Sequence, residues 1–575
     1  MGQASDIAGT DGWAGVAERR WRRTVAAILL VTFAAYLPCA ANGYVWDDVP
    51  LIVLSDRFEA PFSLLRIFSE DLWAGAAIGE AEASGYYRPL MVLGLWADHW
   101  LGAGAGGAHV HSLVWHVAAV GVCGWLGHRI GGPRAAWMGA LVLALHPLQT
   151  EAVLWVAARN DLMAATLGMA ALGMALGPLT IGNAVSAGVL ALLAGLSKES
   201  VLLLPVLLVV MAWVTLPGPR DRDWWTDVGR RALPLFLGIL VVVALRAWAG
   251  VDSARGPTAL GWRLVAAEMP RLLGLLAAKV LVPWPLSTGY ALEYVDRLSV
   301  PWLLGGGLGT LALLVGLVWR GGARAIAGLC WSVVCAAPAI WAVATTGWVG
   351  ERYLYLSFVG LGWALAAALD DRRHRLLLGV LLLLVGSTSA VLRTSDWRTD
   401  RTLWTSAWQA SPSPFTAVSL GHAARTEGED SEALEWFIRG LDDPEPTESA
   451  CEPMMGTALG SRKMMLAAQL GHWAAAQGCR SPAFRGRFAI ALASTAQWQA
   501  VEGVVDGEED AAGRILVARA ALAQARSDDA AYQRIAAEWS GEQPLDEQVH
   551  AIFDNASRFA PARSDTVTLP DGGGP

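Results

Sequence analysis

The chain has 575 residues, of which 54% are hydrophobic and 16% are charged, and its formal net charge at neutral pH is -8. Soluble proteins carry about one quarter charged residues, so this composition excludes an ordinary soluble protein and indicates that lipid surrounds much of the chain. The negative charge comes largely from the C-terminal part and gives no support to nucleic-acid binding.

Residues 24–393 contain repeated apolar runs of about 20 residues, the length that crosses a hydrocarbon core of ~30 Å. Four arginines precede the first run and no convincing cleavage site closes it, which predicts a signal anchor with residues 1–23 in the cytoplasm. We predict eleven membrane helices, with twelve or thirteen as the alternative. The predicted spans are 24–41, 109–127, 135–149, 160–177, 183–197, 200–216, 232–250, 300–319, 325–345, 353–370 and 376–393.

Charge in the short loops supports this topology, because cytoplasmic loops carry the excess of Arg and Lys. The segment from Arg263 to Pro285 is apolar enough to span, but a helix crossing there would put Arg320 and Arg324 outside. We therefore predict an amphipathic or re-entrant piece, and the C-terminal part emerges outside. The basic residues of the predicted inside loops are His128, Arg129, Arg134, Arg220, Arg222, Arg230, Arg231, Arg320, Arg324, Arg372, Arg373 and Arg375.

Residues 394–559 have ordinary polarity and predict a soluble helical domain, whereas residues 560–575 are rich in Pro, Ser, Thr and Gly and predict disorder. The residues of 419–437 resemble one tetratricopeptide (TPR) repeat, a helical hairpin. Leu470-Gly471-His472 begins a degraded second copy, and Ala-rich helical pairs follow. A plain helical bundle and a peptide-binding groove both remain open for this domain.

Cysteines and histidines give no sign of a metal site. Cys451 and Cys479 lie in the soluble domain and can pair if that domain is exported. No Cys-x-x-Cys motif or Cys/His cluster is present. His109, His111 and His116 do not share one helical face well, so we predict neither a metal ion nor a cofactor, although a divalent cation stays a less favoured alternative.

Two adjacent carboxylates, Asp47 and Asp48, follow the first predicted span directly. Ionisable residues at a membrane are expensive and are therefore functional candidates by default. A carboxylate at the headgroup level can act as a general base on a hydroxyl or orient a phosphate-bound metal. The alternative is that the pair only ends a helix at the water boundary.

Further charged motifs follow in order along the predicted outside face. They are Trp46-Asp47-Asp48, Tyr87-Arg88-Pro89-Leu90, His146-Pro147 with Thr150-Glu151-Ala152-Val153, Arg159-Asn160-Asp161-Leu162, Ser197-Lys198-Glu199 and Glu351-Arg352-Tyr353-Leu354-Tyr355-Leu356. The series resembles the transmembrane-and-TPR-containing (TMTC) family of O-mannosyltransferases and its bacterial relatives, members of the GT-C superfamily, over nearly the whole chain to about residue 441.

The resemblance implies an all-α, polytopic GT-C fold of about eleven transmembrane helices with a TPR-like soluble domain. It implies transfer of a sugar, mannose first, from a polyprenyl-phosphate donor to a Ser or Thr hydroxyl, with inversion at the anomeric carbon. Asp47 is then the first choice for the base and Asp48 the second. Asp161 would orient the acceptor or the donor phosphate, and its alternative is a helix N-cap.

A donor phosphate needs cations, and Arg88, Lys198 and Arg352 face outside in the predicted topology. Arg offers a planar fork for phosphate oxygens, while Lys offers a compact charge. Their alternatives are solvation for Arg88, pairing with Glu199 for Lys198 and an interfacial anchor for Arg352. The other substrate-site candidates are Arg159, Glu151, Glu199 and Glu351, of which Glu151 has no assigned step.

The lipid-binding loop of the family is only loosely traceable, from Arg271 to Tyr290, and the TPR array is short. The acceptor could therefore be a protein, a glycan or a lipid headgroup, and the tail could bind a protein partner. The alternative functions are a non-catalytic scaffold and a lipid-linked sugar transporter or flippase, which would favour charges at mid-span. The composition suggests a bacterial inner membrane with a periplasmic active site and tail; the equivalent is a luminal face in the endoplasmic reticulum.

Overall fold

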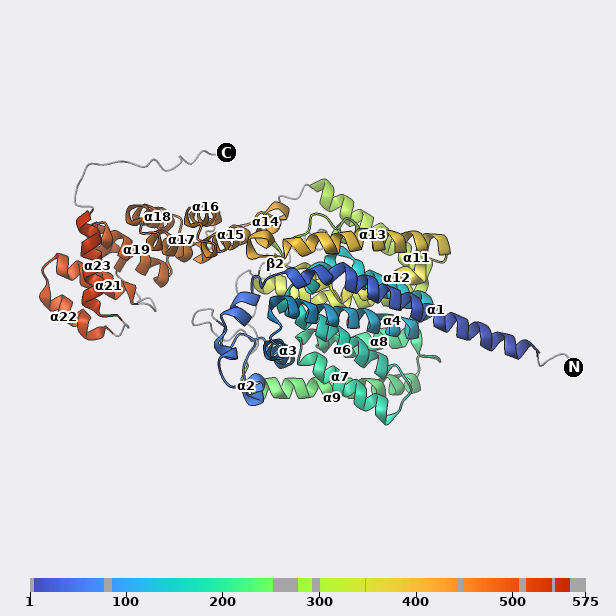
Figure 1. The fold of residues 1–575 in the computed structure, drawn as a ribbon. Helices are drawn as coiled ribbons and strands as arrows, with labels where there is room; N and C mark the ends of the chain where they lie inside the picture. Colours follow the sequence, from blue (N-terminus) through green and yellow to red (C-terminus); the bar gives the residue numbers. More distant parts are fainter. Residues whose placement is uncertain are drawn as a thin grey trace. The chain divides into compact units, whose positions relative to one another are not determined.

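The computed structural model contains two compact units, Met1–Ser411 and Pro412–Pro575, which are described one at a time (Figure 1). The residues that the structure describes are 5–76, 85–251, 278–291, 300–346, 348–441, 448–505, 513–539 and 543–558.

The division falls later in the chain than the sequence places it. The predicted boundary lies between residues 393 and 394, whereas α14 (Asp400–Ala410) belongs to the first unit and contacts α13 (Arg372–Asp396). Residues 252–277, which include most of the predicted amphipathic or re-entrant piece, lie outside the described residues. The predicted disordered segment 560–575 lies outside them as well.

Each of the eleven predicted spans coincides with helix in the first unit. Within the described residues, five helices have the length and composition to cross a membrane, and α7, α8 and α12 are shorter apolar helices. The predicted count of eleven crossings stays a prediction. The span helices are α1 (Ser5–Tyr36), α4 (Gly104–Leu145), α6 (Arg159–Ala175), α7 (Ile181–Gly195), α8 (Leu204–Thr215), α9 (Arg222–Trp248), α11 (Val300–Thr346), α12 (Ser357–Ala368) and α13.

Two pairs of predicted spans are joined without a loop, because a glycine bends the chain between them. Gly132 inside α4 has φ 71° and is followed by Pro133, and Gly322 inside α11 has φ 56°. Positive φ is accessible to glycine at little steric cost. Each long helix is thus two helices meeting at a sharp turn, as the separate spans 109–127 and 135–149 predict for α4.

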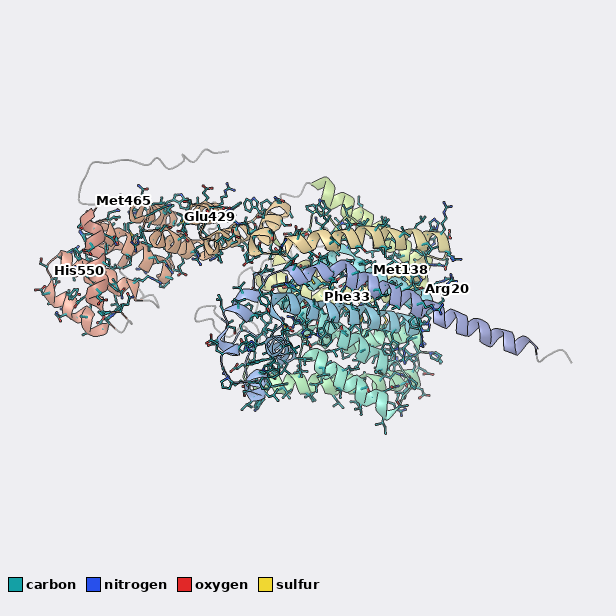
Figure 2. The ribbon with its side chains drawn as sticks, in the orientation of Figure 1. Arg20, Phe33, Met138, Glu429, Met465 and His550 are labelled. Atoms are coloured by element: carbon teal, nitrogen blue, oxygen red, sulfur yellow. A yellow bond between two sulfur atoms is a disulfide. The ribbon has the colours of Figure 1, made fainter. Side chains whose placement is uncertain are left out.

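The helices of this bundle run roughly along one direction (Figure 1). Small residues allow their close approach: an added Cβ at Gly360 of α12 would collide with the carbonyl oxygen of Gly328 on α11. The outward surface is apolar, with Leu377 and Leu384 of α13 59% and 61% exposed. A soluble monomer rarely exposes such a surface, so the bundle is a multi-pass membrane domain. Figure 2 shows Arg20 nearer the N-terminal end of α1 than Phe33, whose ring is exposed on the bundle surface.

Short elements gather at the end of the bundle where α1 ends, and they carry the charged motifs (Figure 1). β1 and β2 pair antiparallel, with Tyr290 opposite Val349. The helix α3 was not predicted. The short elements are η1 (Leu37–Ala41), η2 (Val49–Val53), η3 (Asp56–Phe58), α2 (Leu64–Ser69), α3 (Pro89–Trp100), η4 (Pro147–Gln149), α5 (Thr150–Leu154), η5 (Val156–Ala158), η6 (Glu199–Leu203), β1 (Tyr290–Ala291), β2 (Trp348–Val349) and η8 (Glu351–Leu354).

The second unit consists of helical hairpins, and two of them share one packing device. Gly421 of α15 lies against the ring of Phe437 on α16, and Gly471 of α18 lies against the ring of Phe488 on α19. Its helices are α15 (Pro414–Thr426), α16 (Asp430–Leu441), α17 (Glu448–Gly460), α18 (Met464–Ala476), α19 (Pro482–Ser494), α20 (Trp498–Val505), α21 (Arg514–Ala525), α22 (Asp529–Glu538) and α23 (Leu545–Arg558).

The second unit differs from the first in its surface and in its cysteines. Among its described residues, the large hydrophobic side chains that are exposed are Phe415 and Met465, the latter labelled in Figure 2. Cys451 and Cys479 form a disulfide with their Cα atoms 6.0 Å apart. Helical hairpins agree with the predicted helical domain, while its TPR character rests on the sequence resemblance alone.

Candidate active site

The loop after η1 carries the two predicted acids and is tied to the chain at the end of α13. The side-chain amide of Asn42 donates to the carbonyl of Thr394 at 3.0 Å, and the amide of Gly43 donates to the carbonyl of Arg398 at 3.0 Å. Trp46 has φ 54°, an uncommon conformation for a residue with a bulky side chain. Its ring stacks on that of Trp155, with centroids 4.4 Å apart and planes within 5°.

Asp47 is partly exposed at this loop, whereas its neighbour is not. Burial raises the pKa of Asp47 to about 6, and the positive charge of Arg352 opposes that rise. The carboxyl is therefore ionised at neutral pH and can accept a proton. A base with a pKa near the working pH combines the right protonation state with useful proton affinity.

Asp48 is fully buried, and its carboxyl group accepts hydrogen bonds from two backbone amides. Its Oδ1 accepts the amide hydrogen of Ala157 at 2.7 Å, and its Oδ2 accepts that of Val45 at 3.4 Å. Burial raises its pKa to about 8, which the hydrogen bonds from Ala157 and Val45 oppose. Asp48 thus joins the first loop to η5, the segment that follows Trp155.

Arg352 is the best-fixed of the predicted cations. Its guanidinium forms an ion pair with the buried Glu151, whose other oxygen accepts the Arg352 backbone amide at 2.9 Å. The guanidinium carbon also lies 4.6 Å from the ring centroids of both Trp155 and Tyr353. Stacking and ion pairing together hold a planar cation in one orientation.

Lys198 and Arg88 complete a group of cations with Arg352. Lys198 Nζ lies 2.5 Å from Asp161 Oδ1 and 5.5 Å from the ring centroid of Tyr353. Burial lowers the pKa of Lys198, and the positive charges of Arg88 and Arg352 lower it further while Asp161 opposes the change. Arg88 and Arg352 are therefore close enough to Lys198 for their charges to lower its pKa.

Arg88 reaches this group from the start of α3. Its guanidinium donates two hydrogen bonds to Glu199, at 3.0 and 3.3 Å, and lies 4.5 Å from the ring centroid of Tyr86. The acids Glu151, Asp161 and Glu199 each balance one cation of the group. Positive charge held this way suits an anion with several oxygens, such as a phosphate, which can share the donors of all three cations.

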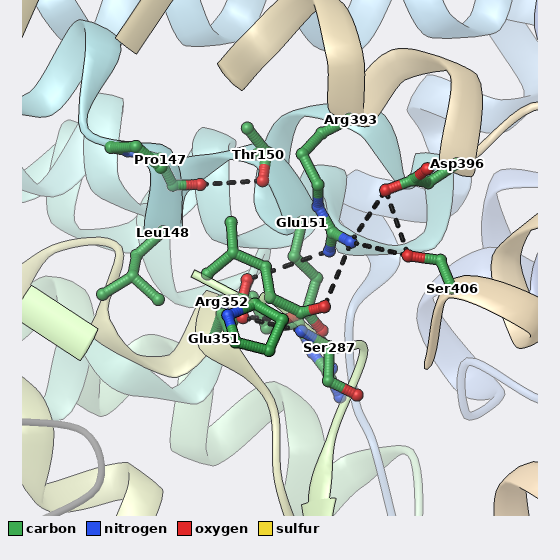
Figure 3. A network of polar contacts seen from close by, with 12 residues as sticks. Pro147, Leu148, Thr150, Glu151, Ser287, Glu351, Arg352, Arg393, Asp396 and Ser406 are labelled. Carbon is green, nitrogen blue, oxygen red and sulfur yellow. Dashed lines mark hydrogen bonds and ion pairs between the residues drawn. The ribbon is translucent and has the colours of Figure 1, made fainter. Parts of the chain in front are cut away.

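Glu351 is fully buried and holds the segment before β1 in place (Figure 3). Its Oε1 accepts hydrogen bonds from the Tyr290 hydroxyl at 2.7 Å and the Ser287 amide at 3.0 Å. Its Oε2 lies 4.0 Å from Arg393 Nη2, and Arg393 pairs with Asp396 at 3.1 Å. Burial raises the pKa of Glu351 to about 7. Glu351, the residue before Arg352, therefore helps to hold the Arg352 backbone in place through these contacts.

Arg159 lies apart from the group, with no exposed surface. Its guanidinium pairs with Asp98 at 2.6 Å and donates to Ser112 at 3.0 Å and to the Ala108 carbonyl at 2.7 Å. Asp98 also lies 2.7 Å from His111 Nδ1. This buried network joins α3 and α6 to α4, so the donors of Arg159 are used in the packing of these helices.

The structure thus brings together Asp47, Asp161 and three cations from motifs up to 305 positions apart, as counted from Asp47 to Arg352. Sequence reasoning missed Trp155, which lies next to a motif it used, and Asp98, an acid in an otherwise apolar stretch. The histidines of the second span have protein partners: His109 lies 3.0 Å from the Gly43 carbonyl and His116 lies 2.8 Å from the Tyr355 hydroxyl. Within the described residues no three His, Cys, Asp or Glu side chains form a metal-binding group.

Comparison with known proteins agrees with the resemblance stated above. The chain is 24% identical over 446 residues to a protein O-mannosyl-transferase of Caenorhabditis elegans, an alignment that covers 73% of this chain and 63% of the relative. It is 31% identical over 156 residues to the human protein O-mannosyl-transferase TMTC4, covering 24% of this chain and 21% of the relative. Mouse TMTC3 is 28% identical over 150 residues, covering 26% and 16%. The predicted resemblance to the TMTC proteins is confirmed.

The chain spans less than two thirds of the length of these curated relatives. No family model matches it. Among solved structures, the chain is similar to ArnT from Cupriavidus metallidurans bound to undecaprenyl phosphate, with a TM-score of 0.37 and 16% identity over 80% of each chain.

Proposed function

We propose that this chain is a membrane glycosyltransferase that moves a sugar, mannose first, from a polyprenyl-phosphate donor to a hydroxyl group. The acceptor hydroxyl belongs to a protein Ser or Thr, or to a glycan or lipid headgroup. The reaction takes place on the outer face of the membrane, where the short elements carry the charged motifs. The similarity to proteins named O-mannosyl-transferases supports the sugar and the protein acceptor.

The observation that carries this proposal is the pairing of an ionised, partly exposed carboxylate with a fixed group of cations. The guanidinium carbon of Arg352 lies 5.7 Å from the ring centroid of Trp46, the residue before Asp47, and its charge opposes the raised pKa of Asp47. Arg352 in turn shares Tyr353 with Lys198. A base on one side and positive charge on the other are what displacement of a phosphate from a sugar requires.

In the proposed reaction the acceptor oxygen attacks the anomeric carbon as Asp47 takes the hydroxyl proton. The bond between that carbon and the phosphate oxygen breaks, its electron pair leaves with the polyprenyl phosphate, and the configuration inverts. Arg88, Lys198 and Arg352 stabilise the charge that grows on the leaving phosphate. Asp161 keeps Lys198 in place, which fits the predicted role in orienting the donor phosphate.

We propose that the cations make a divalent metal unnecessary. Arg88, Lys198 and Arg352 are each paired with one acid, and their remaining N–H groups can donate to the oxygens of a phosphate. The aromatic rings of Trp155 and Tyr353 flank Arg352 and offer apolar faces beside the phosphate site. Sugar rings and isoprenoid chains both pack on such faces.

The test uses the full chain in nanodiscs with radiolabelled undecaprenyl-phosphate mannose, a pool of Ser- and Thr-containing peptides and a chelator. We compare wild type with Asp47→Asn, which keeps the shape of the side chain and loses the base. Loss of a general base slows a reaction by roughly 10²–10⁴-fold. The matched control is Asp370→Asn, since Asp370 is 83% exposed and pairs with Arg134, which belongs to none of the charged motifs.

Consumption of the donor by wild type and the control, with a large loss in Asp47→Asn, would support both the donor class and the base. Equal consumption by all three would remove Asp47 from the mechanism. If a folded wild type consumes undecaprenyl-phosphate glucose and spares the mannose donor, the sugar is reassigned. Consumption of neither donor, with and without added Mg²⁺, would reject the proposed function.

A further inference from the structure

The segment from the last turn of α13 to the first residue of α14 lies against the loop that carries Asp47. Three residues of this loop donate hydrogen bonds to it: the Asn42 side-chain amide to the Thr394 carbonyl, the Gly43 amide to the Arg398 carbonyl and the Trp46 amide to the Asp400 carboxylate. An added Cβ at Gly43 would lie 3.3 Å from the Arg398 carbonyl oxygen, so the two segments are in close contact. The loop is therefore shaped by residues about 350 positions later in the sequence.

The contact at Trp46 has the strongest effect on Asp47, because it acts on the preceding residue. Asp400 Oδ1 accepts the Trp46 amide hydrogen at 2.8 Å. Trp46 has φ 54°, a conformation that is unfavourable for a residue with a side chain and persists only where the surroundings hold it. A charged acceptor makes a stronger hydrogen bond than a neutral one, so Asp400 is suited to hold this conformation.

Helix α14 also contacts the side chain of Trp46. The ring of Trp404, one turn after Asp400, meets the Trp46 ring edge to face with centroids 5.1 Å apart. The other face of Trp46 stacks on Trp155. A rotation of Trp46 would therefore break contacts at its amide and at its ring, and it would change the direction of the Asp47 side chain that follows it.

We infer that Asp400 is a positioning residue for Asp47, which acts by holding Trp46 in its left-handed conformation from the first turn of α14. The inference rests on the proposed function, in which Asp47 is the base. Asp400 does not touch the reacting atoms. Its effect is to set the direction in which the Asp47 carboxylate points.

Three variants separate positioning from a general effect on α14. Asp400→Ala removes the acceptor for the Trp46 amide, while Asp400→Asn keeps an oxygen that can accept it. Thr399→Ala is the matched control, because Thr399 caps α14 through a hydrogen bond from the Thr402 amide at 3.2 Å without touching Trp46. The double variant Asp47→Asn with Asp400→Ala asks whether the two residues act through one another.

The first readout is hydrogen exchange of the Trp46 amide in the intact chain in nanodiscs, which needs no substrate. We expect at least tenfold faster exchange in Asp400→Ala and wild-type exchange in Asp400→Asn and Thr399→Ala. Unchanged exchange in Asp400→Ala would overturn the inference whatever the chain's activity is. A wild type that consumes no polyprenyl-phosphate sugar rejects the proposed function instead, so the two failures are distinguishable.

The second readout is turnover of undecaprenyl-phosphate mannose. We expect kcat to fall at least tenfold in Asp400→Ala with little change in the donor KM, and to return toward wild type in Asp400→Asn. In the Asp47→Asn background, Asp400→Ala should cause no further loss. An equal loss in Thr399→Ala, or an independent further loss in the double variant, would overturn the positioning role.

Discussion

Asp47 and Asp48 are adjacent in the chain, yet their surroundings give them different roles. Asp47 is partly exposed and lies within the field of Arg352, and its pKa is about 6. Asp48 has no exposed surface, accepts two backbone amides and has a pKa of about 8. A proton acceptor must reach its substrate, so in the proposed reaction exposure favours Asp47 as the base, while Asp48 shapes the loop through its two backbone hydrogen bonds.

The pKa of Asp47 predicts the pH dependence of turnover. The carboxyl must be ionised to accept a proton, so kcat/KM should rise about tenfold per pH unit below pH 6 and become flat above about pH 7. Arg352→Gln removes the charge that opposes the raised pKa, and the rising limb should move to higher pH. Stopped-assay rates with undecaprenyl-phosphate mannose between pH 4.5 and 8.5 measure this limb.

The control for the pH profile is Arg134→Gln, an exposed arginine that pairs with Asp370. It should leave the rising limb where wild type has it. A limb that stays in place in Arg352→Gln as well would contradict the assignment of that limb to Asp47.

The raised pKa of Asp48 predicts that the free energy of unfolding falls as pH rises, whereas an ordinary ion-paired acid makes it rise. Its folded pKa of about 8 lies above the ordinary 3.8, so its contribution is fully present below pH 4 and is lost as pH rises through 8. Asp48→Asn keeps an oxygen for the Ala157 amide and carries no charge. We expect the free energy of unfolding of Asp48→Asn, relative to that of wild type, to be greater at pH 9 than at pH 5.

Asp48→Ala is the companion variant, because it removes the acceptor and leaves the buried Ala157 amide unsatisfied. That loss costs about 1–3 kcal/mol. Thermal unfolding in one detergent, followed by tryptophan fluorescence, compares the three proteins. A wild type that keeps the same stability difference from Asp48→Asn at both pH values would show that Asp48 is not buried as a titrating acid.

At the scale of helices, apolar run length predicted a position that is helical for each of the eleven spans, because lipid demands long apolar segments whatever the packing. The helix α3 was missed: its 12 residues start at Pro89 and lie beside the bundle, where length gives no signal. The boundary at Ser411 was also missed, because it depends on α14 packing against α13. Packing between distant helices is not encoded in local hydropathy.

The candidate site, like the helices, was only partly predictable from the sequence. The order of charged motifs identified Asp47, Arg88, Lys198 and Arg352, but no local pattern indicates which acid meets which cation. Glu151 and Arg352 pair across 201 positions, and Arg88 and Glu199 pair across 111. Pairing with its neighbour Glu199 was an alternative role for Lys198, whereas its partner in the structure is Asp161.

Close packing between α11 and α12 provides a prediction for the bundle. An added Cβ at Gly360 would collide with the Gly328 carbonyl and the Ser332 side chain, so Gly360→Ala must push the helices apart. Overpacking of this kind costs about 1–3 kcal/mol. The control, Gly316→Ala on α11, meets no atom within 4 Å and should be neutral or slightly stabilising. Equal melting temperatures for the two variants in nanodiscs would contradict this packing.

At the scale of the whole chain, the disulfide and the arginine pattern are separate indications of the side of the membrane on which the second unit lies. Disulfides persist in oxidising compartments and are rare in the cytosol. The Cys451–Cys479 bond in the second unit therefore favours an exported tail. Eleven crossings from an N-terminus inside the cell also place that tail outside. The disulfide therefore favours an odd number of crossings without using the charges of the loops.

This orientation predicts how the two thiols react in intact cells. After the other four cysteines are replaced by serine, a membrane-impermeant maleimide should label the tail only after a reducing agent has been added. A cysteine introduced at Arg373, in a predicted inside loop, is the control and should react only once the membrane is opened. Tail labelling that needs an opened membrane would place the second unit inside and make the number of crossings even.

The same bond should also stabilise the second unit measurably. It closes a loop of 28 residues, and the chain-entropy argument gives about 3.5 kcal/mol for such a loop. Replacing both cysteines by alanine should therefore lower the unfolding temperature of the second unit while the bundle is unaffected. Because Met454 and Met455 of α17 are also buried in this core, a change confined to the second unit would show that its hairpins unfold on their own. A parallel loss in the bundle would mean that the two units unfold together.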